Sequence, residues 1–74
     1  MNDDKEIKFE IVKRIGALSE ARGAWTKEVN LVSWNEREPK IDIRDWNEDH
    51  TRMGKGLTLT SEEAATLARL LGTL

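Results

Sequence analysis

The sequence predicts an α+β fold in which four β-strands precede one C-terminal α-helix. Short segments of alternating apolar and polar residues recur between residues 7 and 59 with polar loops between them, as half-buried strands require. The last fifteen residues instead show helical periodicity behind an N-capping signal. The chain has 74 residues, so we expect one small domain over residues 7–74, preceded by a disordered charged leader at residues 1–6.

The four predicted strands differ in the strength of their patterns. The first begins with clear alternation over residues 7–11, becomes irregular and ends near Gly16. The second covers residues 25–34, which contain several β-forming residues. The third covers residues 40–46, where the period of two is strictest, and a short fourth covers residues 55–59 after a polar loop.

The predicted helix begins at a capping box. Thr60 and Glu63 have the spacing at which a hydroxyl and a carboxylate satisfy each other's backbone amides. At about 100° per residue, the apolar side chains of residues 64–74 cover roughly 220° of the helix, whereas a surface helix needs about 100°. We therefore expect two packing surfaces, one for the helix's own sheet and one for a second copy in a homodimer. The alternative is a fraying terminal helix with surplus leucines.

Composition excludes several classes of protein. Twelve basic and 14 acidic residues give a net charge of −2, which disfavours nucleic-acid binding through bulk positive charge. The sequence contains no cysteine, which excludes disulfides and thiolate metal sites. No segment approaches the ~18 apolar residues of a membrane span, and the polar N-terminus does not resemble a secretory signal, so we expect a cytoplasmic protein. A chain this short buries only about 60% of its unfolded surface, which also favours a homodimer.

All three tryptophans lie in the hairpin formed by the second and third predicted strands. We expect Trp34 to face Lys40, a register that continues with Val32–Asp42, Asn30–Arg44 and Glu28–Trp46. Strand alternation then predicts a core face made of Val29, Leu31, Ile41 and Ile43. The opposite face is expected to meet solvent and carries Trp34, Lys40, Arg44 and Trp46, with Glu28, Asn30, Val32 and Asp42 among them.

Tryptophans between basic side chains on an exposed sheet face meet the requirements for binding single-stranded nucleic acid. Unpaired bases stack on indole rings for about 1–3 kcal/mol each, whatever their sequence, while lysine and arginine contact phosphates. Two other interpretations stay open: the tryptophans belong to the core or a dimer interface, or the face captures a peptide or another protein. Single-stranded RNA also stays open as the ligand, because stacking and phosphate contacts do not read the sugar.

The order of these segments resembles the positive-cofactor-four family of transcriptional coactivators. The likeness is carried by Ile-Asp-Ile-Arg-Asp-Trp at residues 41–46, by Gly-Lys-Gly-Leu-Thr-Leu at residues 54–59 and by the capped helix that follows. Residues 25–35 resemble the small bacterial members of YdbC type, and the likeness extends from about Phe9 to Leu71. It implies a curved antiparallel sheet followed by one helix, a symmetric homodimer, and binding of single-stranded DNA across the outer, concave sheet faces.

The resemblance also implies individual contacts with the nucleic acid. The family's binding arginine falls on Arg44 and a lysine at the entry to its fourth strand falls on Lys55. Its two aromatic positions fall on Trp34 and Trp46, and a basic loop residue falls on Arg52. The position of the basic residues within the hairpin adds Lys40 and Lys27 as candidates.

The sequence also departs from the family's pattern. Glu36 and Glu38 make the loop between the second and third strands more acidic, which reduces the expected number of phosphate contacts. The sequence has no counterpart of the Ser- and Lys-rich regulatory tail of eukaryotic members, so we do not expect their regulated promoter function.

The residues outside the hairpin do not form a catalytic or metal-binding motif. His50 has the carboxylates of Asp45 and Asp49 nearby in the sequence but no second histidine or cysteine, and we expect it in a solvated loop. The serines lack the setting of a catalytic nucleophile. We therefore expect no enzyme activity, no metal and no cofactor.

The remaining residues of the hairpin and the fourth strand are expected to be structural. Asp42 would orient Arg44 or Lys40 by pairing across strands, and Met53 and Trp25 would pack. Residues 54–56 would form a tight turn or allow a ligand to approach the backbone closely. The combined expectation is a non-catalytic, non-sequence-specific binder of single-stranded DNA. Its expected role is coactivator-like, or in replication or repair, with transcription or repair machinery as possible partners.

Overall fold

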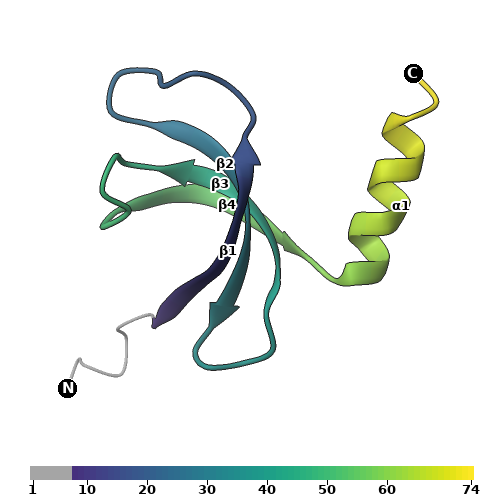
Figure 1. Cartoon of the computed structure of the whole chain (residues 1–74), viewed down its shortest axis with the longest axis horizontal. Coiled ribbons are helices and arrows are strands. Elements are labelled where there is room, and N and C mark those ends of the chain that lie inside the picture. Colours follow the sequence, from purple (N-terminus) through teal and green to yellow (C-terminus); the bar gives the residue numbers. More distant parts are fainter. Residues whose placement is uncertain (1–7) are drawn as a thin grey trace.

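The computed structural model describes residues 8–74, which form one antiparallel sheet and one helix (Figure 1). The strands lie side by side in sequence order and are followed by the helix: β1 (Phe9–Ala17), β2 (Thr26–Trp34), β3 (Lys40–Trp46), β4 (Met53–Leu59) and α1 (Ser61–Leu71). The predicted α+β order of strands and helix is confirmed, although β4 already begins at Met53. The leader predicted at residues 1–6 and the expected strand start at Ile7 lie outside the described residues.

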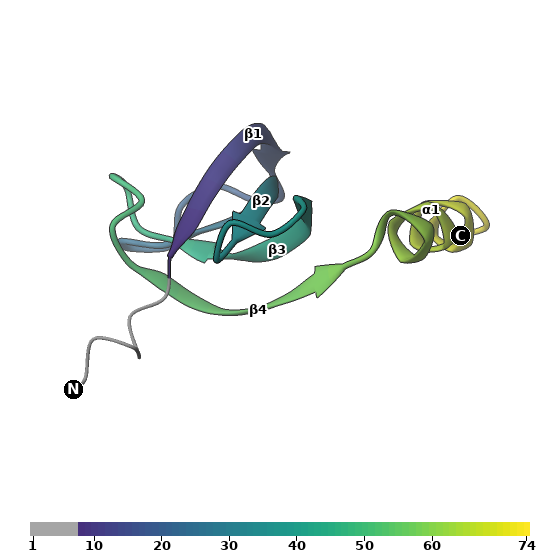
Figure 2. The same cartoon turned by 90° about the horizontal axis from the view of Figure 1, so that it is seen from below.

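The sheet curls so that β1 lies over one of its faces (Figure 2). The pairing of β1 with β2 shifts register between Ile11 and Lys13 and again between Arg14 and Gly16. Such bulges bend a strand and increase its twist. We call the face covered by β1 the inner face; it carries the even-numbered side chains of β2 and β3, from Glu28 to Trp34 and from Lys40 to Trp46. The outer face carries the odd-numbered side chains of the same strands.

The core lies on the inner face, which is the reverse of the expectation from the sequence. The buried side chains of the described residues all lie there: Asn30, Val32, Asp42 and Trp46. The apolar residues expected to form the core, Val29, Leu31, Ile41 and Ile43, are only half-buried on the outer face. The expectation that the tryptophan-bearing face meets solvent is therefore wrong over most of its area. The curl explains this, because β1 covers the inner face while, within residues 8–74, the outer face is approached by the β1–β2 loop at one end only.

The pairing of β2 with β3 also differs from the expected register. Val32 pairs with Lys40, and the pairing continues with Asn30–Asp42, Glu28–Arg44 and Thr26–Trp46, so each predicted pair is wrong. The turn between the strands is longer than assumed, since Asn35 and Glu36 both adopt positive φ angles. Trp34 therefore extends beyond β3 and pairs with Phe9 of β1. The error equals one strand period, so the division of residues between the two faces is unchanged.

The helix begins as predicted but packs differently. The amide of Glu63 donates to the Thr60 hydroxyl at 3.0 Å, and the Thr60 amide donates to the Glu63 carboxylate at 2.9 Å. α1 then projects away from the sheet beyond the end of β4 (Figures 1 and 2), and none of its residues is buried. The expectation that α1 packs against its own sheet is therefore wrong. No helix within residues 8–74 is long and apolar enough to span a membrane.

Candidate nucleic-acid interface

Arg44 is held in place by a buried carboxylate. Its Nε and Nη2 atoms donate to the two oxygens of Asp42 at 2.6 and 3.0 Å, and Asp42 is 0% exposed. The hydroxyl of Thr58 on β4 donates to the same carboxylate at 2.9 Å. The prediction that Asp42 orients Arg44 is confirmed, but the two residues lie on the same strand and do not pair across strands. A paired arginine and carboxylate in this fork geometry is both charge-assisted and directional.

The guanidinium group of Arg44 lies over the indole ring of Trp34, 4.8 Å from the ring centroid. Its Nη1 atom donates to the Gly54 carbonyl at 3.3 Å and contacts the Met53 sulfur at 3.7 Å. Together with the two bonds to Asp42, these contacts use four of the five N–H donors that an arginine carries. The side chain remains 15% exposed. One N–H donor thus has no partner within residues 8–74, and a small part of the side chain reaches solvent.

Trp46 lies beneath this rim and is sealed from solvent. Its ring is 5.2 Å from Phe9 and 5.4 Å from His50, and the residue is only 1% exposed. Phe9 also contacts Trp34 at 5.9 Å, so it links the two tryptophans. The expectation that Trp46 is an exposed ring is therefore wrong, because β1 and the β3–β4 loop cover it. Trp34 is half-buried and has a buried indole nitrogen without a partner among the described residues.

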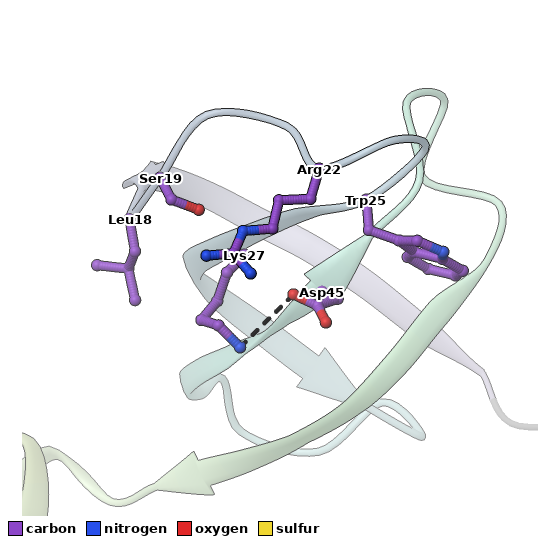
Figure 3. A pocket seen from close by; sticks show the side chains of 6 residues that line it. All are labelled: Leu18, Ser19, Arg22, Trp25, Lys27 and Asp45. Atoms are coloured by element: carbon purple, nitrogen blue, oxygen red, sulfur yellow. Dashed lines mark ion pairs between the residues drawn. The ribbon is translucent and has the colours of Figure 1, made fainter.

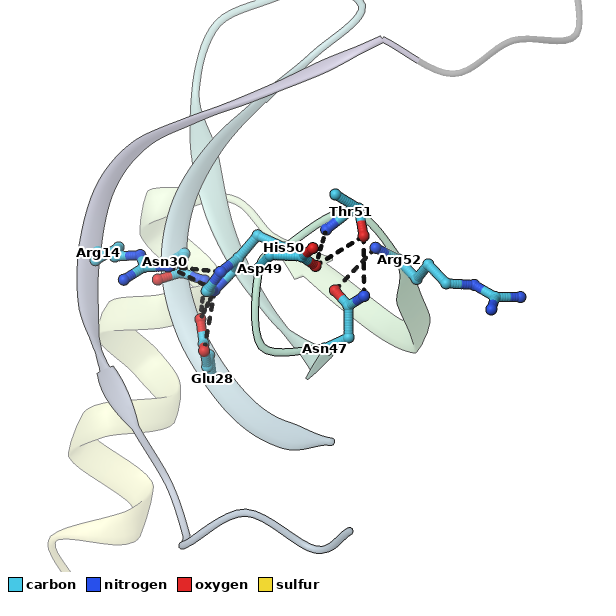
Figure 4. A network of polar contacts seen from close by, with 8 residues as sticks. All are labelled: Arg14, Glu28, Asn30, Asn47, Asp49, His50, Thr51 and Arg52. Atoms are coloured by element: carbon cyan, nitrogen blue, oxygen red, sulfur yellow. Dashed lines mark hydrogen bonds and ion pairs between the residues drawn. The ribbon is translucent and has the colours of Figure 1, made fainter. Parts of the chain in front are cut away.

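His50 joins a polar network that closes the inner face (Figure 4). Its Nε2 atom lies 2.9 Å from the Glu28 carboxylate, and Arg14 of β1 approaches Nδ1 at 2.6 Å. The expectation of a solvated histidine is therefore wrong, and its side chain is largely buried. Burial raises the pKa of Glu28, but hydrogen bonds from His50 and Asn30 and the nearby positive charges outweigh it, so the pKa lies below its usual value. Glu28 stays ionised at neutral pH and ties the β3–β4 loop to β2.

Sequence reasoning missed this closure because its members are far apart in the chain. Phe9, Arg14, Glu28 and His50 belong to three different segments, and the shift in register within β1 decides which of them meet. The only local signal was the irregular pattern in the second half of the first strand. Within residues 8–74, no three potential ligands form a metal site.

The predicted cations divide between the two faces of the sheet. Lys40 is exposed on the inner face, which also carries Arg44 and Trp34. Arg52 is exposed, and its side chain points away from the His50 network (Figure 4). Lys27 lies on the outer face, where it forms an ion pair with Asp45. Lys55 also belongs to the outer face, since it lies in the bulge of β4 opposite Asp45 and alternates with Gly56. The structure therefore does not bring Lys27 and Lys55 together with Arg44.

Comparison with known proteins gives two matches. A family model described as Transcriptional Coactivator p15 (PC4) matches residues 22–70, which is more than half of the chain. A protein of Treponema pallidum (strain Nichols), described as uncharacterized, is 40% identical over 74 residues, covering 100% of this chain and 85% of its own length. The family match includes β2, β3, β4 and most of α1.

Proposed function

This chain belongs to the PC4 family of transcriptional coactivators, and from this premise we propose that it binds single-stranded DNA without reading its sequence. The proposed role is non-catalytic, in coactivator-like handling of exposed strands or in replication or repair. The family is one of single-stranded DNA binding and coactivation.

The Arg44–Trp34 pair is the single observation that supports this site best. A planar guanidinium fixed by Asp42 and stacked on an indole forms a rigid platform, and an unpaired base can stack on such a plane. The remaining Nη2 donor can meet a phosphate or a base edge. Trp46 is linked to Trp34 through Phe9 and is not itself proposed to stack on a base. Duplex DNA has no free base faces to offer, so this chemistry favours single strands.

Lys40 and Arg52 are proposed to contact phosphates around the platform. Both are exposed, and Lys40 shares the inner face with Arg44. Each neutralised phosphate releases counterions, so binding should weaken as the salt concentration rises. The logarithm of the binding constant should fall only modestly with the logarithm of the salt concentration, because few cations contribute. The acidic residues Glu36 and Glu38 beside Lys40 limit that number further.

We expect Trp34→Ala and Arg44→Lys each to weaken binding of oligo-dT by about 10-fold or more, since each removes half of the stacking platform. Arg44→Lys keeps the charge but loses the plane. The measurement is fluorescence anisotropy of labelled oligo-dT, with duplex of the same sequence and oligo-rU as competitors. Lys13→Gln, a charge change on β1 away from the platform, is the matched control. Equal affinity for duplex and single strand, or no effect of either variant, would contradict the proposal.

We further propose that the chain acts as a homodimer in which the second copy covers α1. Leucines on the helix are exposed to solvent, namely Leu67, Leu70, Leu71 and Leu74, and Leu57 on the outer face is exposed as well. The projecting helix gives a radius of gyration of 13.5 Å, whereas a compact chain of this length has about 11 Å. Apolar surface of this kind is stabilised by burial against another copy.

Leu70→Glu is expected to convert the dimer to monomer, because a charge replaces an apolar side chain in the proposed interface. The molecular mass measured by light scattering should then fall from twice the chain mass to the 8.5 kDa of a single chain. Thr66→Glu introduces the same charge on the polar side of α1 and should leave the dimer intact. A wild-type mass of one chain at tens of micromolar (roughly the range in which weak interfaces dissociate) would defeat this proposal.

A further inference from the structure

A cavity of about 340 Å³ lies between the β1–β2 loop and the outer face of the sheet (Figure 3). It is on the opposite side of the sheet from the Arg44–Trp34 pair. Its walls combine apolar, cationic, hydroxyl and carboxylate groups contributed by Leu18, Ser19, Arg22, Trp25, Lys27 and Asp45. The proposed function uses none of these residues, although Lys27 was among the cations that the sequence suggested for nucleic-acid binding.

A tight hairpin presents Arg22 and Trp25 to this cavity. The amide of Arg22 donates to the Trp25 carbonyl at 2.6 Å, and the amide of Trp25 donates to the Arg22 carbonyl at 3.1 Å. Gly23 between them has a φ of 61°, a conformation that glycine adopts without strain. Figure 3 shows the Arg22 guanidinium turned toward Lys27 and the Trp25 indole at the opposite end of the cavity, so the two cations lie together and the indole lies apart from them.

Trp25 differs from the other two tryptophans in its exposure. It is 37% exposed, whereas Trp46 is sealed and Trp34 is covered in part by Arg44. The expectation that Trp25 packs is therefore wrong. A partly exposed indole at one end of a cavity and cations at the other end can take a nucleobase and its phosphate.

The charges of the cavity favour an anion. Within residues 8–74, no acidic group forms an ion pair with Arg22. Lys27 pairs with Asp45 at 3.6 Å, with side chains 51% and 40% exposed. Such a long and exposed ion pair contributes little free energy, so Lys27 can turn to a phosphate at small cost. Two cations against one carboxylate leave the cavity net positive in a chain whose net charge is −2.

We propose that this cavity is a second nucleotide site for single-stranded DNA, in which a base stacks on Trp25 and a phosphate meets Arg22 and Lys27. The inference rests on the proposed single-strand binding and adds to it a contact on the outer face. Lys27 and Trp34 lie at opposite ends of β2, about 23 Å apart along the strand at ~3.3 Å per residue. Only a long strand can occupy both sites. The second site should therefore raise the affinity for long strands over that for short ones.

The test compares strands of about 4 and about 16 thymidines, the two ends of the range of single-strand site sizes. Trp25→Ala and Arg22→Gln should weaken binding of the long strand by about 5- to 10-fold and leave the short strand unchanged. Asp45→Asn removes the competing carboxylate and should strengthen binding of the long strand. Acrylamide quenching supplies an independent readout, because the long strand alone should protect the exposed indole of Trp25, and Trp25→Phe identifies its signal.

The outcomes separate this inference from the proposed function. If Trp34→Ala weakens binding of both the short and the long strand while the Trp25 and Arg22 variants change neither affinity, the second site is overturned and the platform site stands. If those variants weaken both lengths equally, the cavity is not a separate site. If the wild-type chain binds neither strand, the proposed function fails and the second site fails with it.

Discussion

Asp42→Asn is expected to lower the free energy of unfolding by about 3 kcal/mol and to reduce binding of single-stranded DNA at least 10-fold. The carboxylate is fully buried and accepts from Arg44 twice and from Thr58 once. Removing its charge leaves Arg44 without a counter-ion in a largely desolvated position, which costs about 3–5 kcal/mol in buried pairs. Because Arg44 retains some exposure, we expect the lower end of that range. Urea unfolding and oligo-dT anisotropy measure the two effects.

Two further variants distinguish the charge from the packing. Thr58→Val removes the third hydrogen bond without touching the ion pair, so it should cost about 1 kcal/mol and leave DNA binding intact. The double variant Asp42→Asn with Arg44→Gln removes both charges and should recover much of the stability but none of the binding. If Asp42→Asn retained full stability, or if the double variant bound DNA as tightly as the wild type, Asp42 would not be the group that positions Arg44.

The parts of the fold that could be predicted from the sequence depend on neighbouring residues. The third strand matched its prediction over residues 40–46 because a strict period of two is a local property. The capping box at Thr60 and Glu63 was predictable for the same reason, since both partners lie within one turn. The orientation of Arg44 by Asp42 also follows from two residues on one strand.

The parts that could not be predicted depend on how distant segments meet. The register of β2 and β3 is decided by the positive φ angles of Asn35 and Glu36, and glutamate gives no signal of that conformation. Burial of Trp46 depends on Phe9 reaching it from β1, which follows from bulges that alternation does not reveal. The sequence pattern could divide residues between two faces, but only the curl of the sheet determines which face is covered.

Gly56→Ala is expected to destabilise the fold by about 3 kcal/mol and to displace Arg44 from Trp34. Gly56 pairs with Arg44 across β3 and β4, and a Cβ atom there would collide with the Arg44 side chain and the Ile43 carbonyl. The clash involves backbone, so no side-chain rotation relieves it, and overpacking of this kind costs about 1–3 kcal/mol or more. Thermal unfolding measures the loss, and oligo-dT binding should fall with it because the stacking platform no longer forms.

Gly54→Ala is the matched control for this prediction, since the two glycines flank Lys55 in the same strand. A Cβ atom at Gly54 would lie 3.4 Å from the Cβ atom of Asp45, close to ordinary van der Waals contact. Its φ angle is not positive, so alanine fits the backbone and should change stability by less than about 1 kcal/mol. Equal losses in the two variants would mean that glycine is needed here for strand flexibility. A loss confined to Gly56→Ala would instead show that close approach of β4 to Arg44 builds the platform, and this would account for a glycine at that one position of the Gly-Lys-Gly segment.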